Sequence, residues 1–365
     1  MLKNLLLFSV SIVVTLLIFE IIIRVIGYER TTITPLTGFH EYDPELGWKL
    51  IPDYRSRFVH RDFNVEVRTN SDGLRDEEYS TQKNDDTIRV VSLGDSFTWG
   101  WGVENDEVYM QVAEDSLDGF EIINMGQNGY GTGQELLLYK RLGHAFSPDL
   151  VALGFFYNDL TDNVSGGGKP LFDVVGDDLV INNGAETASL EFRIKSFLVR
   201  NSHLFVLANY GYERLRLWLR QLFQAPTNSA GSVQYSRYVK EPDEESERRW
   251  TVFEKIVSEL KHETNDNLLI IYIPDRTEVE TDKEDYINIT SDRDIYDIDY
   301  TRKRLGEMAA KNNIPYMDIT EIFRDEYSRN RDLYLEHDRH MSKAAHKLAG
   351  ELMAEELREI FNASN

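Results

Sequence analysis

Two short stretches of the sequence carry the residue types of nucleophilic catalysis. GDSFTWG places Ser96 directly after an apolar run, and DRHMS places His340 two residues after Asp338. An imidazole can take the proton of a serine hydroxyl, while a carboxylate orients the imidazole and stabilises its positive charge. Each stretch also has a structural interpretation, because Asp95 or Ser96 can cap a helix and a histidine beside acids is commonly a surface residue.

Two further stretches could supply hydrogen-bond donors to such a site. INMGQNGYGTGQE contains Gly126, Gly129, Gly131 and Gly133, and glycines let backbone amides approach a ligand without side chains in the way. ALGFFYNDL ends an apolar run at Asn158, whose amide could face a developing oxyanion. The alternatives are an ordinary glycine turn and an asparagine that only forms a turn.

His337, Asp338 and His340 also raise the question of a metal site. No second His/Asp pair with the ligand spacing of a helix stands out, so we expect no metal and no other cofactor. The sequence has 0 Cys, which excludes a disulfide, a thiolate nucleophile and a cysteine metal site.

The four stretches lie between elements typical of an α/β protein with a parallel sheet. The apolar runs IRVVSL, FEIINM, DLVALGFF, NLLIIYI and IPYMDI are rich in Val, Ile and Leu on both faces, as buried parallel strands are. Helical patterns alternate with them. The predicted helices are 106–117, 134–146, 245–263, 301–312 and 342–361. Since ligands bind beyond the carboxyl ends of such strands, the four stretches fall where a site is expected.

Two segments lie outside this alternation. Residues 28–87 contain short alternating runs and turn dipeptides, which predict a β-rich segment leading into a domain over 88–365. Within that domain, an insertion at about 162–245 holds a glycine loop, an amphipathic stretch with several arginines, and a polar stretch with the composition of a mobile loop. We expect the amphipathic stretch to cover one edge of the sheet; a lid or a contact with a membrane surface is the alternative.

The first 27 residues are apolar enough to span a bilayer. About 20 apolar residues suffice, and Glu20 would lie near the interface. A cleaved signal peptide is the alternative, but no small-x-small cleavage site follows. We therefore expect residues 1–27 to be an uncleaved single-pass anchor, with the catalytic domain extracytoplasmic. Lys3 favours a cytoplasmic amino terminus, whereas Arg24 and Arg30 on the other flank oppose it.

Length and composition suit one main globular domain with additions. The chain has 365 residues, of which 41% are hydrophobic and 12% aromatic, enough for a full core. The formal net charge of -23 favours solubility and repels both nucleic-acid phosphates and anionic lipid headgroups. We therefore expect no nucleic-acid partner.

Taken together and in order, the four stretches resemble the SGNH hydrolases, the superfamily of GDSL-type esterases and lipases. GDSFTWG matches the nucleophile block, NMGQNGYG the glycine block, GFFYNDL the asparagine block and DRHMS the histidine block. The resemblance covers 88–350, with the insertion unmatched. It implies a three-layer α/β/α, flavodoxin-like fold with a parallel sheet.

The resemblance also implies roles for single residues. Ser96 would be the nucleophile, His340 the acid and base, and Asp338 the group that orients His340. The oxyanion hole would consist of the backbone N–H groups of Ser96 and Gly129 and the side-chain amide of Asn158.

The histidine block departs from the usual pattern. Most of the superfamily has Asp three residues before His, where this sequence has His337, although some branches that handle polysaccharide O-acetyl groups show the shorter spacing. The implied function is a membrane-anchored serine esterase that removes small, O-acetyl-like groups from a carbohydrate or similar ester. An O-acyltransferase with the same residues and a non-catalytic scaffold of polysaccharide assembly are the alternatives.

Overall fold

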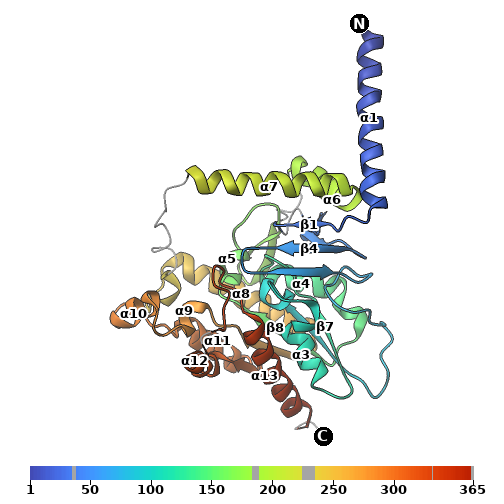
Figure 1. Ribbon diagram of the computed structural model, residues 1–365. Coiled ribbons are helices and arrows are strands. Elements are labelled where there is room, and N and C mark those ends of the chain that lie inside the picture. Colours follow the sequence, from blue (N-terminus) through green and yellow to red (C-terminus); the bar gives the residue numbers. More distant parts are fainter. Residues whose placement is uncertain (35–37, 183–188, 224–234, 331, 363–365) are drawn as a thin grey trace.

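A computed structural model describes residues 1–34, 38–182, 189–223, 235–330 and 332–362. Figure 1 shows a domain built around a central sheet, with helix α1 (Leu2–Val25) extending away from it on its own.

The central sheet has five strands in the order β12-β11-β8-β6-β7. Every neighbouring pair is parallel, and Val91 of β6 is paired with both Ile123 of β7 and Val151 of β8. Each strand lies in one of the five predicted apolar runs. The strands are β6 (Ile88–Gly94), β7 (Phe120–Asn124), β8 (Leu150–Phe155), β11 (Leu268–Tyr272) and β12 (Tyr316–Asp318).

Helices cover both faces of this sheet because its strands are apolar on both sides. In β8, Val151 and Leu153 join one core cluster, whereas Leu150 and Ala152 join another. The first cluster includes residues of α4 (Thr132–Arg141), α8 (Glu244–Glu263) and α11 (Tyr300–Lys311). The second includes residues of α3 (Tyr109–Asp115), α12 (Thr320–Arg329) and α13 (Lys343–Asn362). The predicted three-layer α/β/α fold is confirmed.

The strand order determines where a ligand can bind. Counted along the chain, the order is 2-1-3-4-5 read from β7, the order of flavodoxin-like sheets. The direction of winding reverses between β6 and β8, and such a reversal opens a crevice at the carboxyl ends of the two strands. Ser96 follows β6 and Asn158 follows β8, so both lie at this crevice.

Two of the predicted helices are shorter than expected. The pattern over 134–146 gives α4, which ends at Arg141 before Gly143, and then the 3-10 turn η3 (Gly143–Phe146). The pattern over 106–117 gives the 3-10 turn η2 (Asn105–Glu107) and then α3, with extended backbone at Val108 between them.

Residues 28–87 hold five short strands that pack against the domain. Phe58 of this segment shares a core cluster with Trp99, a residue just after the nucleophile position. The segment therefore borders the candidate site. Its strands are β1 (Thr31–Thr32), β2 (His40–Asp43), β3 (Gly47–Leu50), β4 (Arg55–Val59) and β5 (Asn64–Arg68).

The insertion contains more regular structure than the sequence indicates. It forms the hairpin β9 (Leu171–Val175) and β10 (Asp178–Asn182), then α6 (Leu190–Asn201) and α7 (His203–Phe223). The expected cover over an edge of the central sheet is wrong, because Val199 of α6 and Val206 of α7 are buried with the core of 28–87 instead. The part of the predicted mobile stretch at 224–234 lies outside the described residues.

The remaining elements are short. They are α2 (Ser96–Trp99), α5 (Asp159–Asp162), η5 (Ser236–Tyr238), α9 (Arg276–Val279) and α10 (Glu284–Ser291).

Candidate active site

Ser96 lies at a sharp turn between a strand and a helix. Strand β6 ends at Gly94, and the carboxylate of Asp95 then accepts a hydrogen bond from the backbone N–H of Phe97 at 2.9 Å, which caps α2. Ser96 is the first residue of this one-turn helix, which ends at Gly100 with φ 89°. Asp95 therefore shapes the turn, and the next residue, Ser96, extends from its tip.

Ser96, His340 and Asp338 form a continuous row of hydrogen bonds. The Ser96 Oγ lies 2.7 Å from the Nε2 of His340. The Nδ1 of His340 lies 2.5 Å from the Oδ1 of Asp338. The same Asp338 oxygen accepts the backbone N–H of His340 at 3.1 Å. A histidine between a hydroxyl and a carboxylate in this way can remove the hydroxyl proton while the carboxylate holds its tautomer.

The carboxylate of Asp338 is well suited to carry a negative charge. Burial opposes the charge, but the hydrogen bonds and positive charge of His340 outweigh it and lower the pKa of Asp338 to about 2. Its second oxygen accepts the indole N–H of Trp101 at 3.2 Å. The Trp101 ring also stacks on the His340 ring, with centroids 4.7 Å apart and 16° between the planes.

In the nucleophile turn and the glycine loop, the backbone N–H groups of Ser96 and Gly129 are among those with no acceptor in the described residues. The glycine loop lies against the nucleophile turn, because the Gln127 N–H donates to the Gly94 carbonyl at 3.0 Å. Gly126 has a different position, since its N–H donates to the Asn124 side chain and an added Cβ would lie 2.3 Å from the Trp99 nitrogen. Gly129 has φ +74° and space around it.

Asn158 stands at the start of α5, beside Asp95. Its amide nitrogen donates one hydrogen bond to Asp162 at 2.9 Å, while its side-chain oxygen is buried without a partner in the described structure. The side chain of Asn158 also hydrogen-bonds to Asp95, where it opposes the rise of the Asp95 pKa that burial causes. The structure thus places Asn158 at the same end of the sheet as Ser96.

A group of buried carboxyls lies beneath these residues. Asp95, Glu135 and Asp159 are fully buried, and burial raises the pKa of each, to about 6 for Asp95 and well above the usual range for Glu135 and Asp159. Their mutual repulsion raises the pKa values of Glu135 and Asp159 further. Such groups are best accommodated in the neutral, protonated form.

Sequence reasoning did not identify three residues that support this arrangement. Trp101 directly follows the nucleophile block GDSFTWG, but nothing in its spacing indicates its role. Arg75, fully buried, donates to the carbonyls of Gly100 at 2.5 Å and Val103 at 2.5 Å and so fixes the loop after Ser96. Asp62 pairs with the Nδ1 of His337 at 2.5 Å.

The Asp62 contact separates the roles of the two neighbouring histidines. His337 is held by Asp62 of the segment 28–87, whereas His340 is held by Asp338. Within the described part of the chain, no three His, Asp or Glu side chains are placed to hold a metal ion.

A cavity of about 380 Å³ is lined by Tyr157 and Arg339, which are the chain neighbours of Asn158 and His340. Aromatic and guanidinium groups line it, among them Tyr157, Trp250, Arg237, Arg249 and Arg339. The Arg237 guanidinium lies 3.6 Å over the Tyr157 ring, and its Nε and Nη1 are buried without a partner in the described structure. The cavity therefore offers apolar surface together with strong hydrogen-bond donors.

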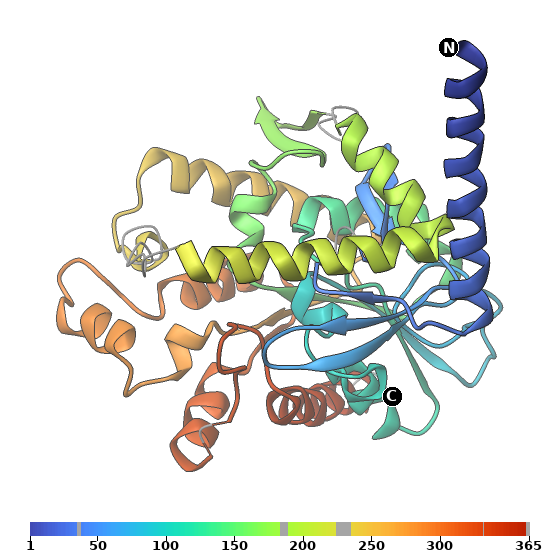
Figure 2. The same cartoon turned by 45° about the horizontal axis from the view of Figure 1, so that its top comes forward.

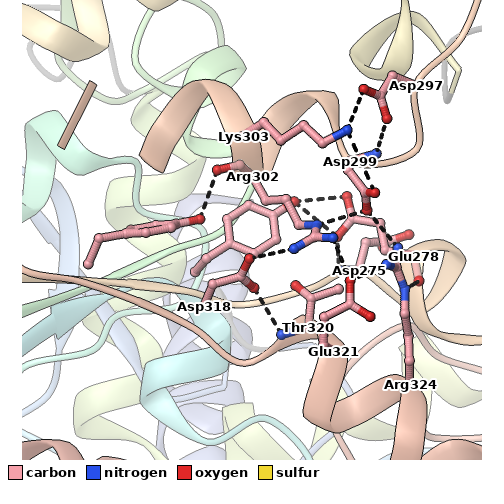
Figure 3. Close-up of polar contacts among 12 residues, drawn as sticks. Asp275, Glu278, Asp297, Asp299, Arg302, Lys303, Asp318, Thr320, Glu321 and Arg324 are labelled. Atoms are coloured by element: carbon pink, nitrogen blue, oxygen red, sulfur yellow. Dashed lines mark hydrogen bonds and ion pairs between the residues drawn. The ribbon is translucent and has the colours of Figure 1, made fainter. Parts of the chain in front are cut away.

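Buried ion pairs fix the arginines of this cavity. The Asp275 carboxylate accepts hydrogen bonds from the guanidinium groups of Arg237 at 2.6 Å and Arg339 at 2.5 Å. Burial raises the pKa of Asp275, but these two positive charges outweigh it and lower that pKa below its usual range. Figure 3 shows Asp275 among the residues of a larger polar network, in which Arg302 of α11 binds Asp318 of β12 at 2.9 Å. This network joins the elements behind the cavity into one support.

The comparison with protein families matches residues 233–364 to the family described as "SGNH hydrolase-like domain, acetyltransferase AlgX". This match confirms the resemblance to the SGNH hydrolase superfamily. The matched range includes Asp338 and His340. It begins after Ser96, Gly129 and Asn158, so it does not test the roles of these three residues. No curated protein matches the chain.

Several solved structures are similar to this chain. A lipolytic protein of the G-D-S-L family from Veillonella parvula is 11% identical, with a TM-score of 0.39, over 76% of this chain and 99% of its own. A lipase/acylhydrolase from Enterococcus faecalis is 16% identical, with a TM-score of 0.39, over 75% and 96%. The acetyl xylan esterase AlAXEase is 14% identical, with a TM-score of 0.41, over 73% and 98%. Identities and TM-scores this low carry no argument about chemistry.

Proposed function

We propose that this protein is an acyl-serine enzyme that cleaves small acyl esters, with Ser96 as nucleophile. Ser96 Oγ attacks the ester carbonyl carbon while its proton passes to His340 Nε2. The tetrahedral intermediate then expels the alcohol, which takes that proton from His340, and the acyl group stays on Ser96. Water or another hydroxyl next attacks the acyl group, and His340 accepts and returns a proton in the same way.

The observation that carries the proposal is the row Ser96–His340–Asp338, with separations of 2.7 and 2.5 Å. A carboxylate with a pKa of about 2 stays charged at neutral pH and so stabilises the imidazolium in each step. We assign the oxyanion hole to the N–H groups of Ser96 and Gly129 and the amide of Asn158. Ser96 and Asn158 follow neighbouring strands at the crevice, the two backbone groups have no acceptor among the described residues, and the Asn158 amide would turn from its carboxylate partners toward the oxyanion.

We infer that the substrate is an O-acetyl-like ester on a carbohydrate. The cavity lined by Tyr157, Trp250 and Arg237 combines aromatic rings with guanidinium donors, and such surfaces can stack on sugar rings and hydrogen-bond to their hydroxyls. Arg339, the chain neighbour of His340, lines this cavity, so the cavity could hold the alcohol part of the ester, which must take a proton from His340. The acetyltransferase description of the matched family supports an acetyl group as the acyl part.

The same description favours a second function, transfer of the acyl group to a sugar hydroxyl instead of to water. The two reactions share the acyl-serine and differ only in the acceptor. A non-catalytic scaffold is less consistent with a hydroxyl, an imidazole and a carboxylate held in one hydrogen-bonded row.

We further propose that α1 anchors the enzyme in a membrane, with the catalytic domain outside the cytoplasm. By length and composition α1 can span a bilayer, and its apolar side chains are almost all exposed.

A fluorophosphonate probe tests the nucleophile. The full-length protein in detergent should be labelled once, at Ser96, and Ser96→Ala should abolish the label. Ser165→Ala, in the exposed loop after α5, is the control and should be labelled like the wild type. Labelling that persists in Ser96→Ala contradicts the proposal. Mass spectrometry of products from an aryl acetate, with and without an oligosaccharide acceptor, distinguishes hydrolysis from transfer.

A further inference from the structure

Helices α6 and α7 expose large apolar side chains that the domain does not cover. On α6, Leu190 is 71% exposed and Phe197 65%. On α7, Leu215 is 53% exposed and Trp218 56%. Single exposed apolar residues are common on soluble proteins, but a continuous row of them marks a contact surface. The exposed apolar residues of the two helices are Leu190, Ile194, Phe197, Tyr212, Leu215, Leu217, Trp218 and Leu219.

Most of the exposed apolar residues lie on the sides of the helices that face away from the domain; Leu217, eleven residues after Val206, is the exception and lies on the same side as Val206. Val199 of α6 and Val206 of α7 are buried in the core of residues 28–87. Leu190 precedes Val199 by nine residues, and Leu215 follows Val206 by nine. At 3.6 residues per turn, nine residues are two and a half turns and lead to the opposite side of a helix. Both helices therefore present an outer apolar face.

The junction of α6 and α7 is fixed to the lower end of α1. The carboxylate of Glu20 accepts the backbone N–H groups of His203 at 3.0 Å and Leu204 at 2.9 Å, and thereby caps the start of α7. Arg24 donates to the carbonyl of Asn201 at the end of α6 at 2.7 Å. The side chains of Glu20 and Arg24 thus bind α6 and α7 at the point where α1 meets the domain.

This junction sets the direction of the three helices. Figure 1 shows α1 rising away from the domain, with α7 lying across its base on the same side of the molecule, and Figure 2 shows α7 crossing in front of the domain. Above Glu20, residues 2–19 form about 27 Å of apolar helix at 1.5 Å per residue. The hydrocarbon core of a bilayer is about 30 Å thick. The base of α1, and with it α7, would then lie at the membrane surface.

We propose that the outer faces of α6 and α7 rest in the interface of the same bilayer that α1 spans. Helices that lie in this region have an apolar side in the acyl boundary and basic residues beside it. Between Leu190 and Leu219 the chain has five Lys or Arg against two Glu, although the whole protein has a net charge of -23. Lys195 pairs with Glu191, Arg216 with Glu213, and Arg200 with Glu41 of β2, so the five cations leave a small positive excess on these helices while the rest of the protein is acidic. The basic residues are Arg193, Lys195, Arg200, Arg214 and Arg216.

Such a contact would hold the catalytic domain against the membrane in one orientation, instead of on a free tether. α1 and α7 are joined by hydrogen bonds. With α1 across the bilayer and α7 along its surface, the domain would keep one orientation relative to the membrane. Ser96 would then lie at a constant distance from the membrane, and the ester substrate would have to reach it there. The inference rests on the anchor of the proposed function and is independent of the acyl-serine chemistry.

Site-directed spin labelling of the full-length protein tests the contact. The sequence has 0 Cys, so each introduced cysteine gives one label. Leu215→Cys and Phe197→Cys report the outer faces, Val13→Cys reports α1, and Lys347→Cys on α13 is the exposed control. The proteins are reconstituted into phosphatidylcholine vesicles containing a minority of phosphatidylglycerol. Label collisions with oxygen, which concentrates in lipid, are compared with collisions with a water-soluble nickel chelate.

We expect labels at 215 and 197 to collide more with oxygen than with the nickel chelate, as at 13, and the label at 347 to show the reverse. Labels at 215 and 197 that behave like 347 while 13 reports lipid overturn the surface contact and leave the anchor intact. A label at 13 in water overturns both. A short distance between the 215 labels of two copies, measured by pulsed dipolar spectroscopy, shows a dimer contact instead and also overturns the proposal. Fluorophosphonate labelling of the same samples reports the chemistry separately.

Discussion

Trp101 contacts two members of the hydrogen-bonded row at once: its ring stacks on His340 at 4.7 Å, and its indole N–H donates to Asp338 at 3.2 Å. The ring limits the tilt of the imidazole, and the N–H fixes the carboxylate rotamer. Trp101 itself is held by Phe58 and Phe63 of residues 28–87, whose rings meet it edge-on. The segment before the domain thereby takes part in positioning the base.

Trp101→Phe should separate the two contacts, since the ring stays and the N–H is lost. A hydrogen bond to a charged group contributes about 1.5–3 kcal/mol, so we expect kcat to fall by about tenfold or more with little change in KM. Trp101→Ala removes both contacts and should lower kcat further. Steady-state kinetics on a short-chain aryl ester measure both. If Trp101→Phe matches the wild type, the N–H has no role in positioning Asp338.

Asp338→Asn tests the irregular spacing of the histidine block. The substitution keeps the shape but favours the wrong imidazole tautomer, so we expect kcat to fall by up to about 10⁴ with the fold intact. His337→Ala is the matched control. It should cost far less, because His337 is bound to Asp62 and not to His340. An Asp338→Asn enzyme within about tenfold of the wild type would reduce the site to a Ser96–His340 dyad.

Asn158→Ala should slow acylation and leave substrate binding nearly unchanged. Loss of one oxyanion donor costs about 10²–10³ in rate, because the donor acts on charge that develops only in the transition state. Asn158→Asp, which keeps the size but replaces a donor by an acceptor, should be at least as slow. Pre-steady-state kinetics with an aryl acetate resolve the acylation step. A raised KM with unchanged kcat would assign Asn158 to ground-state binding.

Asp95→Asn should raise stability at neutral pH while keeping the cap on Phe97, since an amide oxygen can still accept that N–H. Burial raises the pKa of Asp95 to about 6, above the value of about 3.9 in an unfolded chain. The unfolded state therefore loses its proton first, and the wild type loses up to about 3 kcal/mol as pH rises from about 4 to 6.

Melting temperatures of the two proteins at pH 4 and pH 7 measure this difference. The advantage of Asp95→Asn should be small at pH 4 and larger at pH 7. Asp95→Asn also removes the repulsion that raises the pKa values of Glu135 and Asp159, and this change adds to the gain in stability at pH 7. If Asp95→Asn is more stable than the wild type by the same amount at both pH values, the charge of Asp95 does not destabilise the folded protein.

The sequence by itself determined the central sheet and the chain positions of the candidate site. The five strands are apolar on both faces, and that pattern requires helices on both sides in any arrangement. Ser96, Asn158 and His340 stand directly after strands or before a helix, so the α/β alternation already places them at one end of the sheet. Local patterns set these features, and local patterns can be read from the chain.

Only the tertiary structure decided which side chains meet. The sequence predicts that Asp338 orients His340, but it gives no sign that His337 is bound by Asp62, 275 residues away. The roles of Trp101 and Arg75 also depend on contacts between segments distant in sequence. The amphipathic stretch shows the same limit. Its pattern predicts two faces, but the core of residues 28–87 determines which face is buried, and Glu20 determines that the helices lie at the base of α1. Side-chain contacts over such separations follow from packing, which no local pattern encodes.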